Sequence, residues 1–222
     1  MSQHYFSRDP QAPHRPGLVR VILPDVYLEL ETDSGVFSPG RLDPGTRLLL
    51  DQAPPPPDSG DLLDLGCGYG PIACVLAARS PRATIWAVDV NERALELCAR
   101  NAARAGLDNV RCVTPDDGPA LVDAIWSNPP VRIGKQGLYE LLRDWLGRLH
   151  GRAHLVVGRN LGADSLARWL AGQGWPATRL VSRSGYRLLE ITNFERTAGR
   201  TTVHNPGGAV PPDPAAKPRD AT

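Results

Sequence analysis

The sequence predicts an α/β fold, in which a mainly parallel, doubly wound sheet carries helices on both faces and follows a small N-terminal β-extension. Three observations predict it. An apolar run at 62–65 leads into a glycine-rich turn, the next apolar run at 83–89 ends in an aspartate, and strand-like and helix-like patterns alternate from residue 61 onward. Such alternation is typical of parallel strands joined by right-handed helical crossovers.

Residues 1–57 are expected to form an N-terminal unit. Its expected elements are an extended arm at 1–17, two strands at 18–23 and 26–30, a short helix at 43–52 and a polyproline spacer at 54–57. The pair Pro24-Asp25 is a turn signal between the two strands. Asp43 is a plausible N-cap for the helix because Pro44 follows it at the first helical position.

Residues 58–194 are expected to form the core domain. The predicted strands are 62–65, 83–89, 110–114, 121–127, 153–157, 178–182 and 186–192, and the predicted helices are 71–79, 91–105, 136–149 and 165–173. Asn91 is a suitable N-cap and Gly106 a suitable stop for the second of these helices. Residues 195–222 contain hardly a large apolar side chain, so we expect a disordered tail.

The glycine-rich turn predicts a nucleotide-like cofactor beyond the first core strand. Gly66, Gly68 and Gly70 alternate, which removes side chains where the backbone bends and a ligand approaches. Asp89 lies 23 positions after Gly66 (89 − 66), close to the ~20-residue offset at which an acidic side chain reaches a ribose. A dinucleotide fingerprint would place the third glycine one residue later, at Pro71, so NAD is the less favoured cofactor.

Several segments together resemble a known family. DLGCGYG at 64–70, VDVN at 88–91 and SNPP at 127–130 resemble the class I S-adenosylmethionine-dependent methyltransferases. The chain is more narrowly similar to small-domain bacterial methyltransferases related to the 16S rRNA guanine-N2 enzymes. The segments that carry this narrower likeness are HYFS at 4–7, GVFS at 35–38, LDPGTRLLL at 42–50, NPPVRIGK at 128–135 and GYRLLEI at 185–191.

The resemblance covers roughly residues 3–194 and implies a specific fold, cofactor and partner. It implies a Rossmann-like sheet of seven strands with an antiparallel last strand, S-adenosyl-L-methionine as cofactor, and ribosomal RNA or the small ribosomal subunit as partner. The activity it implies is methylation of the exocyclic amine of a guanine in ribosomal RNA. A glutamine methyltransferase of the release-factor type and a non-catalytic S-adenosylmethionine-binding module are the alternatives.

The resemblance also assigns roles in cofactor binding. Asp64 would accept from the ammonium of the methionine moiety, Asp89 from the ribose hydroxyls, and Asp116 from the adenine amino group. Relatives usually have a larger apolar residue after that last aspartate, whereas Asp117 and Gly118 follow here. The full set of expected cofactor-binding residues is Asp64, Gly66, Cys67, Gly68, Gly70, Asp89, Val90, Asp116 and Asn128.

The motif Asn128-Pro129-Pro130 is the predicted catalytic site. Two prolines fix an extended turn and remove N–H donors, which leaves carbonyl oxygens and the Asn128 side-chain oxygen as acceptors. Two hydrogen bonds accepted from an exocyclic amine would direct its lone pair towards the methyl group. Amino-methyltransferases often have an aromatic residue after the prolines, but this chain has Val131, so Phe37 is the candidate for holding a flipped base.

Other substrate contacts are expected around this motif. Arg132 and Lys135 are suited to phosphate contact, or are solvated loop cations. The full set of expected substrate-binding residues is Phe37, Asp43, Thr46, Val131, Arg132 and Lys135.

The composition limits the remaining possibilities. The chain has 25 Lys and Arg against 24 Asp and Glu, so no global positive field indicates a nucleic-acid partner, although a local patch would suffice. The four cysteines lack metal-type spacing, so we expect free thiols and no metal. No apolar stretch approaches the ~18 residues of a membrane helix and no leader pattern opens the chain, so a cytoplasmic location is expected.

Overall fold

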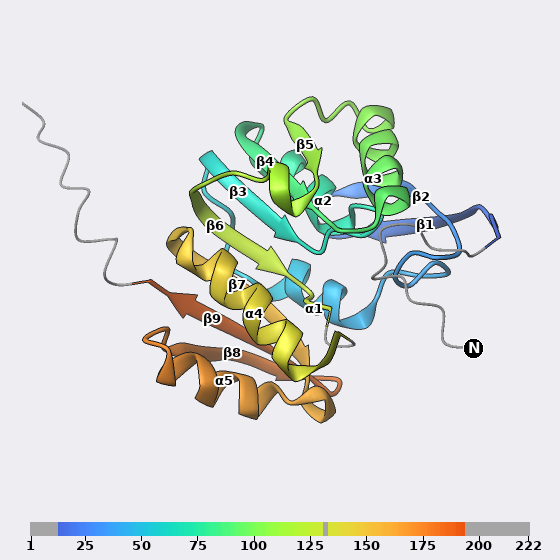
Figure 1. Ribbon diagram of the computed structural model, residues 1–222. Helices are drawn as coiled ribbons and strands as arrows, with labels where there is room; N and C mark the ends of the chain where they lie inside the picture. The colour runs from blue at the N-terminus through green and yellow to red at the C-terminus, as the bar shows by residue number, and fades with distance from the viewer. Residues whose placement is uncertain (1–12, 131–132, 194–222) are drawn as a thin grey trace, which may run out of the picture.

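The computed structural model describes residues 13–130 and 133–193. The predictions for the first part of the arm, for Val131 and Arg132, and for the tail at 195–222 lie outside the described residues. The rest forms a central sheet of seven strands in the order β5-β4-β3-β6-β7-β9-β8, with a separate two-stranded sheet of β1 and β2 beside it (Figure 1).

The bounds of the elements follow the predicted alternation closely. The strands are Gly17–Ile22 (β1), Tyr27–Thr32 (β2), Ser59–Leu65 (β3), Arg82–Val88 (β4), Val110–Val113 (β5), Val122–Ser127 (β6), Leu149–Gly158 (β7), Ala177–Arg183 (β8) and Tyr186–Thr192 (β9). The helices are Pro44–Gln52 (α1), Pro71–Arg79 (α2), Glu92–Arg104 (α3), Gly134–Gly147 (α4) and Ala163–Gly172 (α5), with short 3-10 helices at Pro115–Asp117 and Arg159–Leu161.

The sheet has the predicted directions. Strands β5, β4, β3, β6 and β7 run parallel, whereas β9 pairs antiparallel with both β7 and β8. The last strand of the described residues therefore lies inside the sheet, between β7 and β8. The predicted seven-stranded sheet, its antiparallel last strand and the N-terminal β-extension are confirmed.

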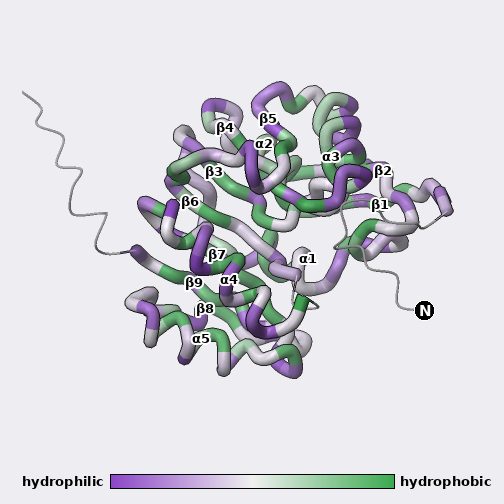
Figure 2. The backbone as a smooth tube through the Cα atoms, viewed as in Figure 1, coloured by the Kyte–Doolittle hydropathy of each residue, from purple (hydrophilic) through white to green (hydrophobic). Residues whose placement is uncertain are grey.

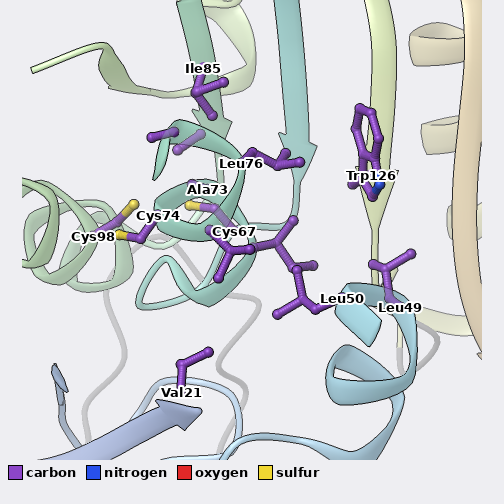
Figure 3. Packing of buried hydrophobic residues seen from close by; sticks show 14 of the residues in the cluster. Val21, Leu49, Leu50, Cys67, Ala73, Cys74, Leu76, Ile85, Cys98 and Trp126 are labelled. Carbon is purple, nitrogen blue, oxygen red and sulfur yellow. The ribbon is translucent and has the colours of Figure 1, made fainter. Parts of the chain in front are cut away.

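Both faces of the sheet are covered, because the side chains of its central strands alternate in direction. Leu62 belongs to the core on the face covered by α1, α2, α3 and the β1–β2 hairpin, whereas Leu63 belongs to the core on the face covered by α4 and α5. Figure 2 shows the apolar colouring concentrated along the central strands. Figure 3 shows the first core from close by, where Cys67, Cys74 and Cys98 pack among aliphatic side chains.

Most element bounds differ from the prediction by one to four residues, and two differences change the element to which a segment belongs. Leu149 was assigned to the helix before β7 because it lies four residues after Trp145, but α4 ends at Gly147 and Leu149 begins β7. There its backbone pairs with Val122 and its side chain is fully buried, so sheet pairing outweighs the helical spacing. The second difference is the 3-10 turn after β5, which the sequence did not predict.

The N-terminal hairpin is tied to the core through one buried amide. Asn101, on α3, donates from Nδ2 to the carbonyls of Glu31 and Tyr69 and accepts from the Glu31 N–H. Tyr69 belongs to the glycine-rich turn. The hairpin, α3 and the turn are thereby held in one arrangement at the carboxyl edge of the sheet.

Candidate functional site

A cavity of about 260 Å³ lies at the carboxyl edge of the parallel strands. This is the edge at which doubly wound folds bind ligands. The predicted site residues that line it are Phe37, Asp43, Gly66, Gly68, Asp89, Val90, Asn128, Pro129 and Pro130.

The glycine-rich turn after β3 forms the floor of the cavity. The N–H groups of Gly66 and Cys67 both donate to the Val88 carbonyl, which ties the turn to the end of β4. Gly66 and Gly68 have φ angles of 76° and 55°, a left-handed backbone that glycine adopts readily. The turn can therefore bend sharply and leave open backbone where a ligand would lie.

Asp89 is fixed against this turn. One carboxylate oxygen accepts from the Gly68 N–H at 2.9 Å and the other from the Asn91 N–H at 3.0 Å. Burial raises the pKa of this carboxyl group, while the backbone N–H donors of Asn91, Gly68 and Val90 act in the opposite direction. Each oxygen keeps lone-pair capacity for a further donor, so the carboxylate fits a pair of ribose hydroxyls.

Asp64 lies beneath the turn rather than in the lining of the cavity. Its side chain is fully buried, and Oδ2 accepts from the Ala73 N–H at the start of α2. Within the described residues, Oδ1 has no hydrogen-bond partner. Burial raises the pKa of Asp64 to about 8, and the negative charge of Asp89 adds to the shift. A buried carboxylate oxygen without a partner fits a cationic ligand group, such as the ammonium of a methionine moiety.

Asn128 is oriented by the start of α1. Its Nδ2 donates to Asp43 Oδ1 at 2.8 Å and to Thr46 Oγ1 at 3.0 Å. The same Asp43 oxygen caps the helix by accepting from the N–H groups of Gly45 and Thr46. Because both amide hydrogens are engaged, the side-chain oxygen of Asn128 is the atom that can accept from a ligand.

The two motifs that the sequence places about sixty positions apart meet at this point. Ser127 donates from its hydroxyl to the Leu65 carbonyl at 2.6 Å, joining the ends of β6 and β3. A Cβ atom at Gly66 would lie 3.6 Å from Cδ of Pro130, so the cofactor turn touches the Asn-Pro-Pro motif. The Pro130 carbonyl accepts from the Ile133 N–H, which favours the Pro129 carbonyl as the second acceptor for an amine.

Some predicted site residues do not line the cavity. Thr46 is buried and holds Asn128, whereas Lys135 lies 5.5 Å from the centre of the Tyr139 ring. Asp116 is exposed on the 3-10 turn after β5, and its neighbour Pro115 lines the cavity instead.

Two predicted cofactor residues have packing roles. Cys67 is buried in the core beneath the turn. A Cβ atom at Gly70 would lie 2.6 Å from Cys98 Sγ, so this glycine allows α3 to pack closely. The predictions for Val131 and Arg132 fall on residues that the structure does not describe.

The cavity lining also contains residues that the sequence motifs did not predict. The additional residues are Leu65, Val88, Asn91, Ala94, Pro115, Leu141, Val156, Val157, Gly158, Leu161 and Tyr186. Gly158 is the last residue of β7 and Leu161 follows it, and the carboxyl end of β7 meets the same sheet edge. Tyr186 begins the antiparallel β9, which starts at this edge because it runs the other way. The predicted strand directions were therefore the signal that could have found them.

Two further observations on the described residues concern metal binding and membrane spanning. No group of three or more His, Cys, Asp or Glu side chains in 13–130 and 133–193 could hold a metal ion. Across the same part of the chain, no helix is long and apolar enough to span a membrane.

Comparisons with known proteins identify the family of the chain. The model of the methyltransferase small domain family matches residues 27–173. The YbxB protein of Bacillus subtilis is 33% identical over 197 residues, which cover 86% of this chain and 98% of that protein. Ribosomal RNA small subunit methyltransferase C of Pseudomonas aeruginosa is 38% identical over 80% of this chain and 57% of its own length. The corresponding Hahella chejuensis protein is 44% identical over 72% and 48%.

A solved structure shares the fold. The T. thermophilus 16S rRNA N2 G1207 methyltransferase (RsmC), solved with AdoMet and guanosine, has a TM-score of 0.68 at 22% identity and covers 82% of this chain. The match covers 51% of that protein, so the chain spans about half the length of the ribosomal RNA methyltransferases that it matches. The expected cofactor, S-adenosylmethionine, agrees with the family and with the fold. The chain belongs to the methyltransferase small domain family.

Proposed function

We propose that this protein is an S-adenosylmethionine-dependent methyltransferase that modifies the exocyclic N2 amine of a guanine in the RNA of the small ribosomal subunit. The observation that carries the proposal is the fixed orientation of the Asn128 side chain, which lines the cavity next to the glycine-rich turn. Its free side-chain oxygen is a hydrogen-bond acceptor, and an exocyclic amine is a donor through both hydrogens. The names of the P. aeruginosa and H. chejuensis relatives support ribosomal RNA as the substrate.

The cofactor would lie along the glycine-rich turn. Asp89 would accept from the ribose hydroxyls, and Asp64 Oδ1 would face the ammonium of the methionine moiety, directly or through water. Val90 would pack on the adenosine, since its side chain lines the cavity and is 42% exposed. When bound, S-adenosylmethionine supplies a methyl group on a sulfonium centre.

The target amine would be held between Asn128 and the Pro129 carbonyl. Two accepted hydrogen bonds pull the amine out of conjugation with the ring and point its lone pair at the methyl group. The amine nitrogen gains the bond to carbon, the carbon–sulfur bond breaks with its electron pair on sulfur, and one amine proton leaves to water. The protein supplies orientation and fixed dipoles, and no strong base is needed.

Phe37 is the proposed partner of the flipped base. It lines the cavity, is 38% exposed, and lies on the segment that leads into α1. A base stacked on its ring would compensate for the aliphatic residue at position 131.

The experiment is methyl transfer with cofactor carrying a labelled methyl group. The substrates are small ribosomal subunits and 16S rRNA prepared without modifications, and the label is followed into RNA and into protein. Label in a guanosine nucleoside as the N2-methyl derivative supports the proposal. Label in a protein glutamine would overturn it in favour of the release-factor type of methyltransferase, and cofactor binding without transfer to either acceptor would indicate a binding module.

A further inference from the structure

We propose that Arg41, Arg159 and Arg183 form a rim that binds the phosphates of the RNA strand on either side of the target nucleotide. This inference rests on the proposed function and assigns the contact surface that the near-neutral composition left open. The three arginines come from three segments: the loop before α1, the first residue after β7, and the last residue of β8.

Arg159 and Arg183 both lie next to Tyr186 in the backbone, and Tyr186 lines the cavity. In the sheet register, Tyr186 lies opposite Gly158 on one side and opposite Arg183 on the other. Residues directly opposite one another in an antiparallel pair project to the same face, so the Arg183 side chain is on the face of the Tyr186 ring. The Arg159 N–H donates to the Gly185 carbonyl at 2.7 Å, which places this residue against the β8–β9 turn.

Arg41 reaches the same place from the N-terminal unit. A Cβ atom at Gly45 would lie 2.7 Å from the Tyr186 ring, so the start of α1 packs directly on Tyr186. Arg41 comes four residues earlier in the chain. Burial and the charge of Asp43 raise the pKa of Tyr186, and the Arg41 guanidinium acts against them, which agrees with its position near the ring.

These three guanidinium groups are available for an external anion. All three side chains are exposed, and within 13–130 and 133–193 none of them forms an ion pair with a carboxylate. Arg187 provides the contrast, because it projects to the opposite face of β9 and pairs with Asp164 on α5.

The carboxyl edge of the parallel strands therefore has an acidic half and a basic half. Its β3–β5 half carries Asp64, Asp89, Asp116 and Asp117, where the proposed cofactor has its ammonium and hydroxyl donors. Its β7–β9 half carries the unpaired arginines, which suit the phosphates of a polyanion. Total charges that nearly cancel over the chain are therefore compatible with a local cationic surface.

Exposed apolar side chains next to the rim suit an unpaired strand better than a duplex. Leu161 lines the cavity with 61% of its surface exposed, and Phe37 lines it with 38% exposed. Bases splayed out of a single strand can pack on such side chains while the backbone follows the cations. The geometry thus places phosphates on the arginines and bases towards the cavity.

The test compares a triple variant, Arg41→Gln, Arg159→Gln and Arg183→Gln, with Arg82→Gln. Arg82 is a matched control because it is exposed at the first residue of β4, on the opposite edge of the sheet, where it pairs with Asp58. Binding of a fluorescein-labelled single-stranded RNA that contains the unmethylated target guanine is measured by anisotropy between about 50 and about 200 mM salt. Affinity for S-adenosylhomocysteine, measured by calorimetry, verifies that each variant is folded.

The triple variant should bind RNA at least about tenfold more weakly at the lowest salt, and its slope of log K against log salt should be shallower by about 2, since each phosphate contact in a single strand contributes ~0.7. Arg82→Gln should match the wild type in RNA affinity and in the slope of log K against log salt. If the wild type binds and methylates RNA while the triple variant keeps its affinity and slope, the rim is wrong and the proposed function stands. If the wild type neither binds nor methylates RNA, the proposed function fails, and the rim with it.

Discussion

The side-chain amide of Asn128 donates to Asp43 Oδ1 at 2.8 Å, across 85 positions of the sequence. A carboxylate only accepts, so this contact determines which end of the amide faces α1. The nitrogen is held by the helix start, and the oxygen is left for a ligand. A helix N-cap and a predicted catalytic residue are therefore parts of one arrangement.

Removing the Asn128 side chain should separate binding from transfer. Asn128→Ala should leave affinity for S-adenosylhomocysteine almost unchanged, because the cofactor contacts lie on the glycine turn and Asp89. Turnover should fall by about 10²-fold or more, the scale for losing one preorganised polar contact in a closed site. Single-turnover methyl transfer at saturating cofactor measures this. Asn109→Ala is the control, since Asn109 also donates twice from Nδ2 but lies immediately before β5.

Asp43 should act through Asn128 rather than on the substrate. Asp43→Ala removes both the cap and the acceptor for the amide, so turnover should fall between about 10- and about 100-fold while the KM for RNA changes little. The stability cost of the lost cap is about 1 kcal/mol. Asp43→Asn keeps an oxygen acceptor and should restore most of the turnover.

Thr46→Val provides a second check on the same contact. It removes the hydroxyl that accepts from Asn128 at nearly constant volume, so it should lower turnover less than Asp43→Ala. Equal losses of turnover in Asp43→Ala and Asp43→Asn would contradict a positioning role for Asp43. A higher KM for RNA without a loss of turnover would also contradict it.

Asp89 and Asp116 are both assigned to the adenosine, but they should contribute unequally to cofactor affinity. Asp89→Ala should weaken cofactor affinity by roughly 10²-fold, because hydrogen bonds to a charged group contribute ~1.5–3 kcal/mol each and two hydroxyls lose their acceptor. Asp116 is exposed and outside the cavity lining, so Asp116→Ala should cost less than about tenfold. Calorimetric titration with S-adenosylhomocysteine measures both. A larger effect at Asp116 would show that the adenine site is built differently from this account.

Asp64 should make the stability of the ligand-free protein fall with pH. Its folded-state pKa is raised to about 8, above the ordinary ~3.9 of the unfolded chain, so between these values the folded state binds more protons. The free energy of unfolding then decreases with rising pH, by up to about 1.4 kcal/mol per pH unit for this group.

Asp64→Asn should abolish that dependence. The variant's stability relative to the wild type should therefore increase between about pH 5 and about pH 8, in urea unfolding at several pH values. A stability difference that is constant with pH would show that Asp64 does not titrate in this range.

The alternation of strands and helices and the glycine turn could be predicted because their signals are local. Gly66, Gly68 and Asp89 lie next to the strands that position them, and parallel strands bring their carboxyl ends to one edge. The contact between Asn128 and Asp43 could not be predicted, because it depends on how α1 packs against the end of β6. Tyr186 is different, because the predicted antiparallel direction of the last strand already places the start of β9 at this edge of the sheet.

The role of Asp64 shows another limit on what the sequence can predict. Its position before the turn predicted a ligand contact, but the pattern could not show that one oxygen is used by the Ala73 N–H and the other left without a partner. Burial and hydrogen bonding of single atoms depend on the packed structure. Leu149 illustrates the same point for a boundary, since helical spacing placed it in α4 whereas pairing with Val122 placed it in β7.

The most direct test of the central claim is nucleoside mass mapping of 16S rRNA after reaction with the wild type and with Asn128→Ala. Small subunits from cells that lack this gene serve as substrate, and the cofactor is saturating for both proteins. The account predicts one guanosine converted to its N2-methyl derivative by the wild type, and conversion slower by about 10²-fold with Asn128→Ala. Full-rate methylation by Asn128→Ala, or a methyl group at a position other than an exocyclic amine, would contradict it.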